Sequence, residues 1–158
     1  MLNSSTMTVD PGMNTGWAFW LDKEQPQASG VFRFRKIKNS TTTVTVQLQE
    51  MWMQFDNLLS FLKPKYVILE NNAWWPGDTR SLAAVRSGDL RKLTLLTGGY
   101  CLQANRIGAL WEMVEPVTWK GQLTDAALGA QILEITGKEY RKHEQEAVGI
   151  GLWKAGRL

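Results

Sequence analysis

The sequence Tyr-Val-Ile-Leu-Glu at residues 66–70 is an unbroken apolar run that ends in a carboxylate. Such a run is typical of a strand covered on both faces, as in a parallel pair reached by a helical crossover. The segment before it supplies that crossover, because apolar residues recur there at helical spacing and Pro64 requires the helix to end before it. The residues with this spacing are Leu48, Met51, Phe55, Leu58 and Leu62.

Two short strands are predicted ahead of this crossover, at residues 6–10 and 15–21. The sequence between them, Asp-Pro-Gly-Met-Asn, is typical of a turn, because proline fixes φ, glycine accepts positive φ and aspartate can bond the turn's own backbone. In residues 30–38, Phe32 and Phe34 alternate with Arg33 and Arg35, which predicts a third strand. These three strands are expected to form an antiparallel meander.

The second half of the chain predicts further helices and one more strand. A helix is expected over residues 79–97, ended by a glycine pair, and the sequence WEMVEPV at 111–117 predicts a last short strand that ends before Pro116. Thr124 can cap a third helix that stops at Gly137, and a fourth helix is expected over 141–155. This order of elements predicts an α/β fold with a mixed five-stranded sheet flanked by helices.

Composition limits the class of protein. The 158 residues predict a single domain over 1–158, and a net charge of +3 permits nucleic acid as a partner without requiring it. A single cysteine, Cys101, excludes an intramolecular disulfide and a cysteine-rich zinc site, and it favours a cytoplasmic protein. We expect neither a targeting segment nor a membrane span, because no stretch approaches roughly 18 apolar residues.

Four side chains could converge on one metal site. Asp10 closes the first predicted strand and Glu70 closes the buried one, while His143 and Glu146, three residues apart, share a face of the last helix. If the first and fourth strands are neighbours, these groups meet. Carboxylates brought together without a cation would repel one another, so the cluster predicts a divalent metal. Oxygen ligands favour Mg²⁺, and one imidazole also suits Mn²⁺.

Each of these residues also has a purely structural explanation. Asp10 can be a turn former, Glu70 a solvent-facing acid at a strand end, and His143 a solvated residue in a charged run. Their joint placement favours the metal site. Two glycines in the last helix, Gly149 and Gly151, point the same way, because each costs roughly 0.8–1 kcal/mol relative to alanine unless close packing requires it.

Three sequences, in this order along the chain, carry a resemblance to a known family. "DPGMNTGW" at 10–17, "ILEN" at 68–71 and "HEQEAVGIGL" at 143–152 resemble successive motifs of the RuvC-type Holliday-junction resolvases, particularly the short phage-encoded members. The resemblance spans most of the chain and implies a ribonuclease H-like fold. It also implies that four residues hold two Mg²⁺ ions, with Mn²⁺ as a substitute. These residues are Asp10, Glu70, His143 and Glu146.

The same resemblance implies an activity. Members of the family resolve four-way DNA junctions as homodimers by paired symmetric nicks, with metal ions that activate water for in-line attack and leave 5′ phosphate and 3′ hydroxyl ends. The sequence "PVTWKGQL" at 116–123 resembles the family's segment with a functional lysine, here Lys120, which could neutralise the scissile phosphate. One departure is that Glu146 stands where an aspartate is usual. Another is a first turn one residue shorter than in many bacterial members.

Candidate DNA-binding residues follow the buried strand. Trp74 and Trp75 come soon after Glu70 and could stack on bases exposed at a junction, worth about 1–3 kcal/mol per base, although core packing would also explain them. Basic residues along the second helix could contact phosphates or form a solvated face. They are Arg80, Arg86, Arg91 and Lys92. The same two explanations apply to Arg33, Arg35, Lys36 and Lys38.

Three other functions share some of these sequence features. A non-catalytic or weakly catalytic branched-DNA-binding protein is suggested by Glu146, and metal-dependent nicking of a junction would distinguish it. A ribonuclease H-like nuclease that acts on forks and flaps is a second rival. An actin-like ATPase also begins its phosphate loops with Asp-x-Gly, but it needs two such lobes, which 158 residues cannot supply.

Overall fold

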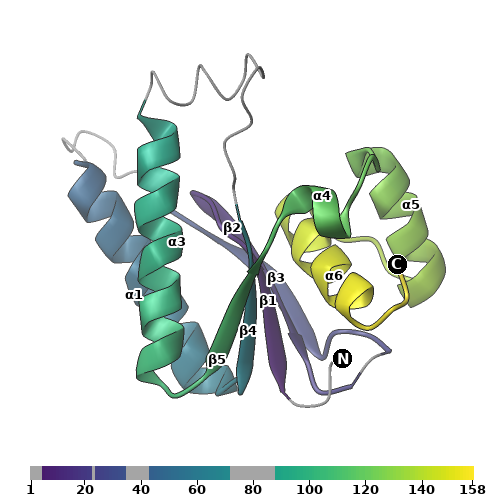
Figure 1. Cartoon of the computed structure of the whole chain (residues 1–158), viewed down its shortest axis with the longest axis horizontal. Helices are drawn as coiled ribbons and strands as arrows, with labels where there is room; N and C mark the ends of the chain where they lie inside the picture. Colours follow the sequence, from purple (N-terminus) through teal and green to yellow (C-terminus); the bar gives the residue numbers. More distant parts are fainter. Residues whose placement is uncertain (1–4, 23, 35–42, 72–87) are drawn as a thin grey trace.

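The computed structural model describes residues 5–22, 24–34, 43–71 and 88–158. In this part of the chain a five-stranded sheet lies between two layers of helices (Figure 1). The strands are β1 (Thr6–Asp10), β2 (Asn14–Trp20), β3 (Ala28–Arg33), β4 (Tyr66–Glu70) and β5 (Leu110–Val114). The helices are α1 (Val44–Leu62), α3 (Asp89–Arg106), α4 (Pro116–Trp119), α5 (Asp125–Thr136) and α6 (Lys142–Lys154).

The strands follow the order β3-β2-β1-β4-β5. β1 pairs antiparallel with β2, and β2 pairs antiparallel with β3, which confirms the predicted meander. β4 lies parallel to both β1 and β5. The mixed sheet and the helical crossover through α1 are therefore confirmed.

α1 has the caps that its sequence provides. The Thr43 side chain accepts a hydrogen bond from the Val46 amide at the start of the helix. At the other end Lys63 adopts a left-handed conformation with φ 49°, and its amide bonds to the Leu59 carbonyl just before Pro64. The residues buried by this helix keep the predicted helical spacing; they are Leu48, Met51, Phe55 and Leu59.

The expected end of the second helix is wrong. α3 continues through Gly98 and Gly99 to Arg106. Gly99 allows close packing, because a Cβ there would overlap the Trp52 indole of α1, whose Nε1 donates to the Leu96 carbonyl at 3.2 Å. Packing between α1 and α3 thus outweighs the intrinsic cost of glycine. Residues 79–87 of the predicted helix, and 35–38 of the predicted third strand, lie outside the described residues.

A short helix replaces part of the last predicted strand. β5 ends at Val114, and Pro116 begins the four-residue helix α4. Proline is favoured at the first position of a helix, because its fixed φ suits the helix and its missing N–H has no partner to lose there. The two C-terminal helices confirm the sequence prediction, and Thr124 caps α5 by accepting from the Ala127 amide.

The period-two alternation of the strands divides the core into two halves. Alternate residues of β1 and β4 pack against α1 and α3; they are Met7, Val9, Val67 and Leu69. Ile68 faces the other way, into the core against α5 and α6. Because Val9 pairs with Leu69, the next residues, Asp10 and Glu70, end adjacent strands on the α6 face of the sheet.

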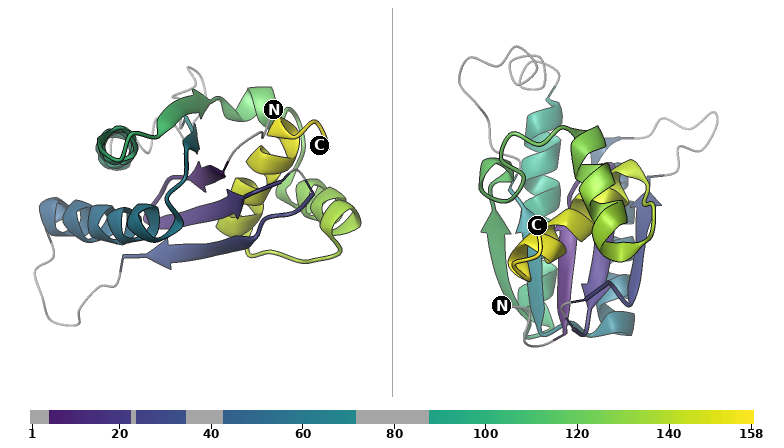
Figure 2. Two further views of the ribbon diagram at one scale, coloured as in Figure 1. Left: turned by 90° about the horizontal axis from the view of Figure 1, so that it is seen from below. Right: turned by 90° about the vertical axis from the view of Figure 1, so that its right-hand side faces the viewer.

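α6 lies against this face, as the left view in Figure 2 shows. Gly16 pairs with Asp10 across β1 and β2, and a Cβ at Gly16 would overlap the backbone carbonyl of His143. Gly151 leaves room for the Trp20 ring, and a Cβ at Gly149 would lie 2.7 Å from the Trp119 ring. The predicted close packing of this helix is confirmed. Within the described ranges, no helix combines the length and apolar content needed to cross a bilayer.

We predict that Gly16→Ala lowers the free energy of unfolding by about 1–3 kcal/mol, because the added methyl must displace the first turn of α6. Gly98→Ala is the control, since a Cβ there meets no atom within 4 Å and alanine is the better helix former. Urea denaturation of both variants measures the difference. Equal stability of Gly16→Ala and the wild type would contradict the close approach of α6 to β2.

Candidate active site

Asp10, His143 and Glu146 meet where β1 ends beneath the first turns of α6. His143 Nδ1 lies 2.8 Å from Asp10 Oδ2 and 3.6 Å from Glu146 Oε2. One ligand atom from each residue lies within 4.8 Å of the other two. The side chains of Asp10 and Glu146 are 8% and 15% exposed, and that of His143 is 35% exposed, so the cluster is largely buried but open on one side.

Backbone placement produces this meeting. Asp10 ends β1 on the face that α6 covers, and His143 and Glu146 project from the same side of α6 because they are three residues apart. Gly16 supplies the space that brings the His143 backbone against β2. Thr8 adds a direct link, because its Oγ1 lies 2.7 Å from the Ala147 carbonyl and donates to it.

Glu70 lies beside the cluster. Its Oε2 accepts a hydrogen bond of 2.9 Å from Trp119 Nε1. Burial, and next the charge of Glu146, raise the pKa of Glu70 to about 7, while the indole bond and Lys120 oppose the rise. Glu70 is therefore within electrostatic reach of the cluster, although it is not among the three residues whose ligand atoms converge.

Asp10 carries the clearest mark of crowding. Burial raises its pKa well above the ordinary value, and the charges of Glu146 and Glu70 add to the effect. Three carboxyl groups thus share a site with too little positive charge to balance them. Carboxylate oxygens with one imidazole suit a hard or borderline divalent cation, so the donor set fits Mg²⁺ or Mn²⁺.

Lys120 is the cation that contacts this group of acids. Its Nζ lies 3.2 Å from Glu146 Oε1 and 2.6 Å from Asp125 Oδ1. Burial disfavours the charged form, but the bonds to Asp125 and Glu146 outweigh it and raise the pKa of Lys120. Asp125 also pairs with Lys142 at 3.2 Å. The lysine is thus held, fully charged, at the edge of the cluster.

The predicted DNA-binding residues are only partly described. Trp74, Trp75, Arg80 and Arg86 lie outside the described residues. Arg91 is exposed on α3, and Lys92 forms a 2.9 Å ion pair with Asp89. Lys92 also borders a cavity of about 200 Å³ together with residues 11–13, the turn that follows Asp10. Arg33 is exposed at the end of β3, whereas Arg35, Lys36 and Lys38 are not described.

Several supporting residues were not identified from the sequence. Thr15 Oγ1 donates to the Gly12 carbonyl at 2.6 Å and lies 2.9 Å from the Tyr100 hydroxyl, so it holds the turn after Asp10. Trp119 contacts Glu70, and Asp125 contacts Lys120. The position of Trp119, immediately before Lys120, is the one sequence signal for its role.

The chain is similar to known proteins in structure, whereas its sequence alone gives no match. No protein-family model and no curated protein matches the sequence. The Thermus thermophilus RuvC structure in complex with a Holliday junction substrate aligns with a TM-score of 0.73 at 14% identity, over 96% of this chain and 92% of that one. A second T. thermophilus RuvC structure aligns with a TM-score of 0.67 at 15% identity, over 96% and 93% of the two chains.

The yeast mitochondrial Holliday junction resolvase Ydc2 aligns with a TM-score of 0.61 at 13% identity, over 97% of this chain and 79% of that one. The similarity thus extends over nearly the whole chain while few residues are identical. The ribonuclease H-like architecture expected from the sequence motifs is confirmed, and the chain has the fold of the RuvC-type Holliday junction resolvases.

Proposed function

We propose that this chain is a metal-dependent endodeoxyribonuclease that resolves four-way DNA junctions by paired symmetric nicks. The observation that carries the proposal is the convergence of Asp10, His143 and Glu146 at the end of β1, on the fold of the RuvC resolvases. The similar T. thermophilus RuvC structure is a complex with a Holliday junction substrate, which supports the choice of branched DNA.

Asp10, Glu70, His143 and Glu146 would hold the metal, as two Mg²⁺ ions with Mn²⁺ as a substitute. Bound divalent ions supply an activated water and a counter-charge for the leaving oxygen, so that 5′ phosphate and 3′ hydroxyl ends result. The raised pKa values of Asp10 and Glu70 support this assignment, because burial and next the charge of Glu146 disfavour their ionised forms, which a bound cation would stabilise.

Lys120 would act on the substrate. Its ammonium group is charged and lies at the edge of the acids, where it can neutralise the scissile phosphate as the strand approaches. Asp125 also pairs with Lys120, at 2.6 Å, so the lysine would keep this partner if Glu146 bound a metal.

The DNA would cross the end of the sheet near α3. Lys92 is suited to a phosphate contact because it borders the turn after Asp10, and Arg91 lies next to it on the same helix. The sequence predicts further DNA contacts outside the described residues. Two tryptophans, Trp74 and Trp75, would stack on bases at the branch point, and two arginines, Arg80 and Arg86, would bind phosphates.

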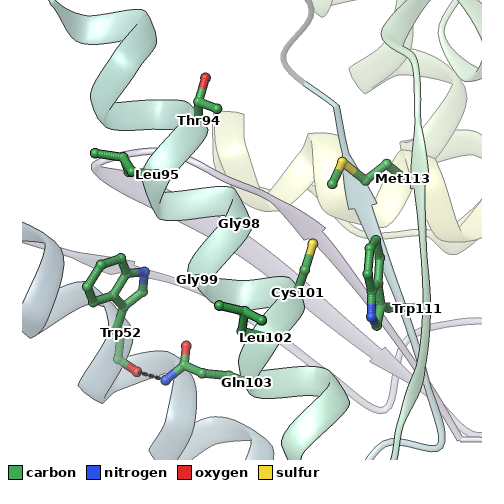
Figure 3. Close-up of a pocket in the computed structure, with 10 residues that line it drawn as sticks. All are labelled: Trp52, Thr94, Leu95, Gly98, Gly99, Cys101, Leu102, Gln103, Trp111 and Met113. Carbon is green, nitrogen blue, oxygen red and sulfur yellow. Dashed lines mark hydrogen bonds between the residues drawn. The ribbon is translucent and has the colours of Figure 1, made fainter.

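We also propose a homodimer, because two symmetric nicks need two active sites related by a two-fold axis. The apolar surface around α3 and β5 supports it. A groove of about 720 Å³ lies there, between side chains of α1, α3 and β5 (Figure 3). Leu102 and Leu110 are 73% and 70% exposed, and Trp111 and Met113 are 42% and 43% exposed, which is unusual for a face that meets only water. A dimeric nuclease acting on DNA also fits the cytoplasmic location predicted from the sequence.

A branched-DNA-binding protein without nuclease activity is the main alternative, suggested by Glu146 in place of the usual aspartate. The longer side chain nevertheless reaches the cluster, with Oε2 3.6 Å from His143 Nδ1. This contact favours the nuclease. Action on forks or flaps would use the same site, so substrate comparison must separate it from junction resolution.

The proposed activity is tested on a plasmid that extrudes a cruciform. We predict that the wild type with Mg²⁺ converts it to linear product by paired nicks, and that Asp10→Asn reduces the rate at least about 100-fold. Binding of Asp10→Asn to a four-way junction should be unchanged or tighter, because the substitution removes a negative charge that faces phosphates. Gel analysis of products and of complexes measures both.

Asp22→Asn is the matched control, because Asp22 is exposed beyond the far end of β2 and should leave cleavage unchanged. Forked, flapped and linear DNA are run in parallel. Normal cleavage by Asp10→Asn would remove Asp10 from the site. Tight junction binding without any cleavage by the wild type would favour the DNA-binding alternative. Preferred cleavage of forks would favour a nuclease that acts on forks and flaps.

Stability should depend on pH through Glu70. Its pKa rises from 4.5 in the unfolded chain to about 7 in the folded one, so the stabilisation present below pH 4.5 is lost as the pH rises through 7. We predict that, over this pH range, the free energy of unfolding of the metal-free wild type falls by up to about 3 kcal/mol more than that of Glu70→Gln. Mg²⁺ should raise the melting temperature more at pH 8 than at pH 5. Thermal melts measure this difference. An equal rise in melting temperature at pH 5 and pH 8 would contradict the assignment of Glu70 as a metal ligand.

A further inference from the structure

We infer that Trp119 is a positioning residue that fixes the carboxylate of Glu70 for metal binding, and this inference rests on the proposed function. Trp119 Nε1 donates to Glu70 Oε2 at 2.9 Å. Trp119 is 4% exposed and Glu70 is 8% exposed, so water competes little for this bond. The indole nitrogen is a donor only, so its N–H remains on the carboxylate whether or not a cation is present.

The chain builds the position of this indole from three elements. α4 is a single turn that begins at Pro116, and it places Trp119 in the core between the sheet and α6. Gly149 of α6 leaves space for the ring, because a Cβ there would lie 2.7 Å from Cζ3 of Trp119. Leu128 of α5 lies in the same core cluster. Packing therefore holds the ring, and the ring in turn holds the direction of the N–H.

Glu70 needs such a partner more than Asp10 does. A glutamate side chain has one more rotatable bond than an aspartate, so ordering it for a cation costs more conformational entropy. The bond from Trp119 fixes Oε2 and leaves Oε1 available as a metal ligand. Groups that hydrogen-bond a metal ligand in this way typically contribute about 10–100-fold to metal affinity.

The same indole also touches the helix that carries the other ligands. Gly149 lies three residues after Glu146 on α6, so the ring of Trp119 contacts both the Glu70 carboxylate and the part of α6 behind Glu146. One side chain thus links the acid at the end of β4 to the ligand-bearing helix. Trp119→Phe removes the N–H that bonds Glu70 and also the ring atom Cζ3 that packs against Gly149, so its effect must be compared with a control that loses the same atoms.

Trp20 provides a matched control within the same core cluster. Its Nε1 donates to Thr8 Oγ1 at 3.0 Å, its side chain is fully buried, and its ring packs on Gly151 of α6. Trp20→Phe thus removes the same kind of indole donor as Trp119→Phe. The acceptor of the lost hydrogen bond is a hydroxyl and not a carboxylate. A general effect of core damage should appear in both variants.

The test compares Trp119→Phe with Trp20→Phe by calorimetric titration of Mn²⁺ into the metal-free protein. We expect Trp119→Phe to weaken Mn²⁺ binding about 10-fold or more, and Trp20→Phe to change it less than about 2-fold at a similar loss of melting temperature. With junction DNA, Trp119→Phe should lower kcat and leave KM unchanged. Equal Mn²⁺ affinities in the two variants would overturn the role of Trp119. A wild type that binds no Mn²⁺ would instead overturn the proposed function.

A measurement on the wild type keeps the inference testable if Trp119→Phe does not fold. The indole N–H resonance of Trp119, assigned through its contact with Gly149, should shift on addition of Mg²⁺ and should shift in Glu70→Gln without metal. The Trp20 resonance should move little in both cases. A Trp119 resonance that moves no more than that of Trp20, in a protein that does bind Mg²⁺, would overturn the inference.

Discussion

The parallel pairing of β1 with β4 is the constraint on which the candidate site depends. The register pairs Val9 with Leu69, so Asp10 and Glu70 end adjacent strands on one face. Both carboxyl groups are then buried under α6, where burial raises the pKa of each and the charge of Glu146 adds to both increases. A different register or an antiparallel pair would separate them. The apolar faces of the same strands hold the sheet against α1 and α3, so the core and the site come from one alternating pattern.

The second requirement is the close approach of α6. Gly16 of β2 lets the backbone of His143 lie against the sheet, and tryptophan rings fill the spaces left by Gly149 and Gly151. Close packing therefore fixes the position of the helix, while ion pairs and hydrogen bonds orient the side chains that it contributes to the site. Lys120 offsets part of the negative charge at the edge of the site. These features together give a buried acidic cluster with one open side, which is the arrangement that nucleic-acid phosphates and divalent cations can share.

The sequence predicted the strands, the crossover through α1, the meander and the last two helices, because each depends on local periodicity, caps and turn residues. It also predicted a convergence of four residues from strand ends and helical spacing; the ligand atoms of Asp10, His143 and Glu146 do converge, whereas Glu70 lies beside them. The end of α3 was wrong, because only the packed structure reveals that Gly99 accommodates Trp52. The roles of Gly16 and Trp119 were missed for the same reason: each depends on a contact between segments far apart in the chain.

We propose that Asp10, His143 and Glu146 together bind a divalent cation. Anomalous diffraction from crystals soaked in Mn²⁺ would locate such an ion without reference to activity. We predict a peak within coordination distance of the Asp10 and Glu146 carboxylates and the His143 imidazole, and no peak there in crystals of Asp10→Asn. An Mn²⁺ peak elsewhere in the molecule, with none at this cluster, in crystals of a preparation that cleaves junctions would show that these three residues are not the metal site.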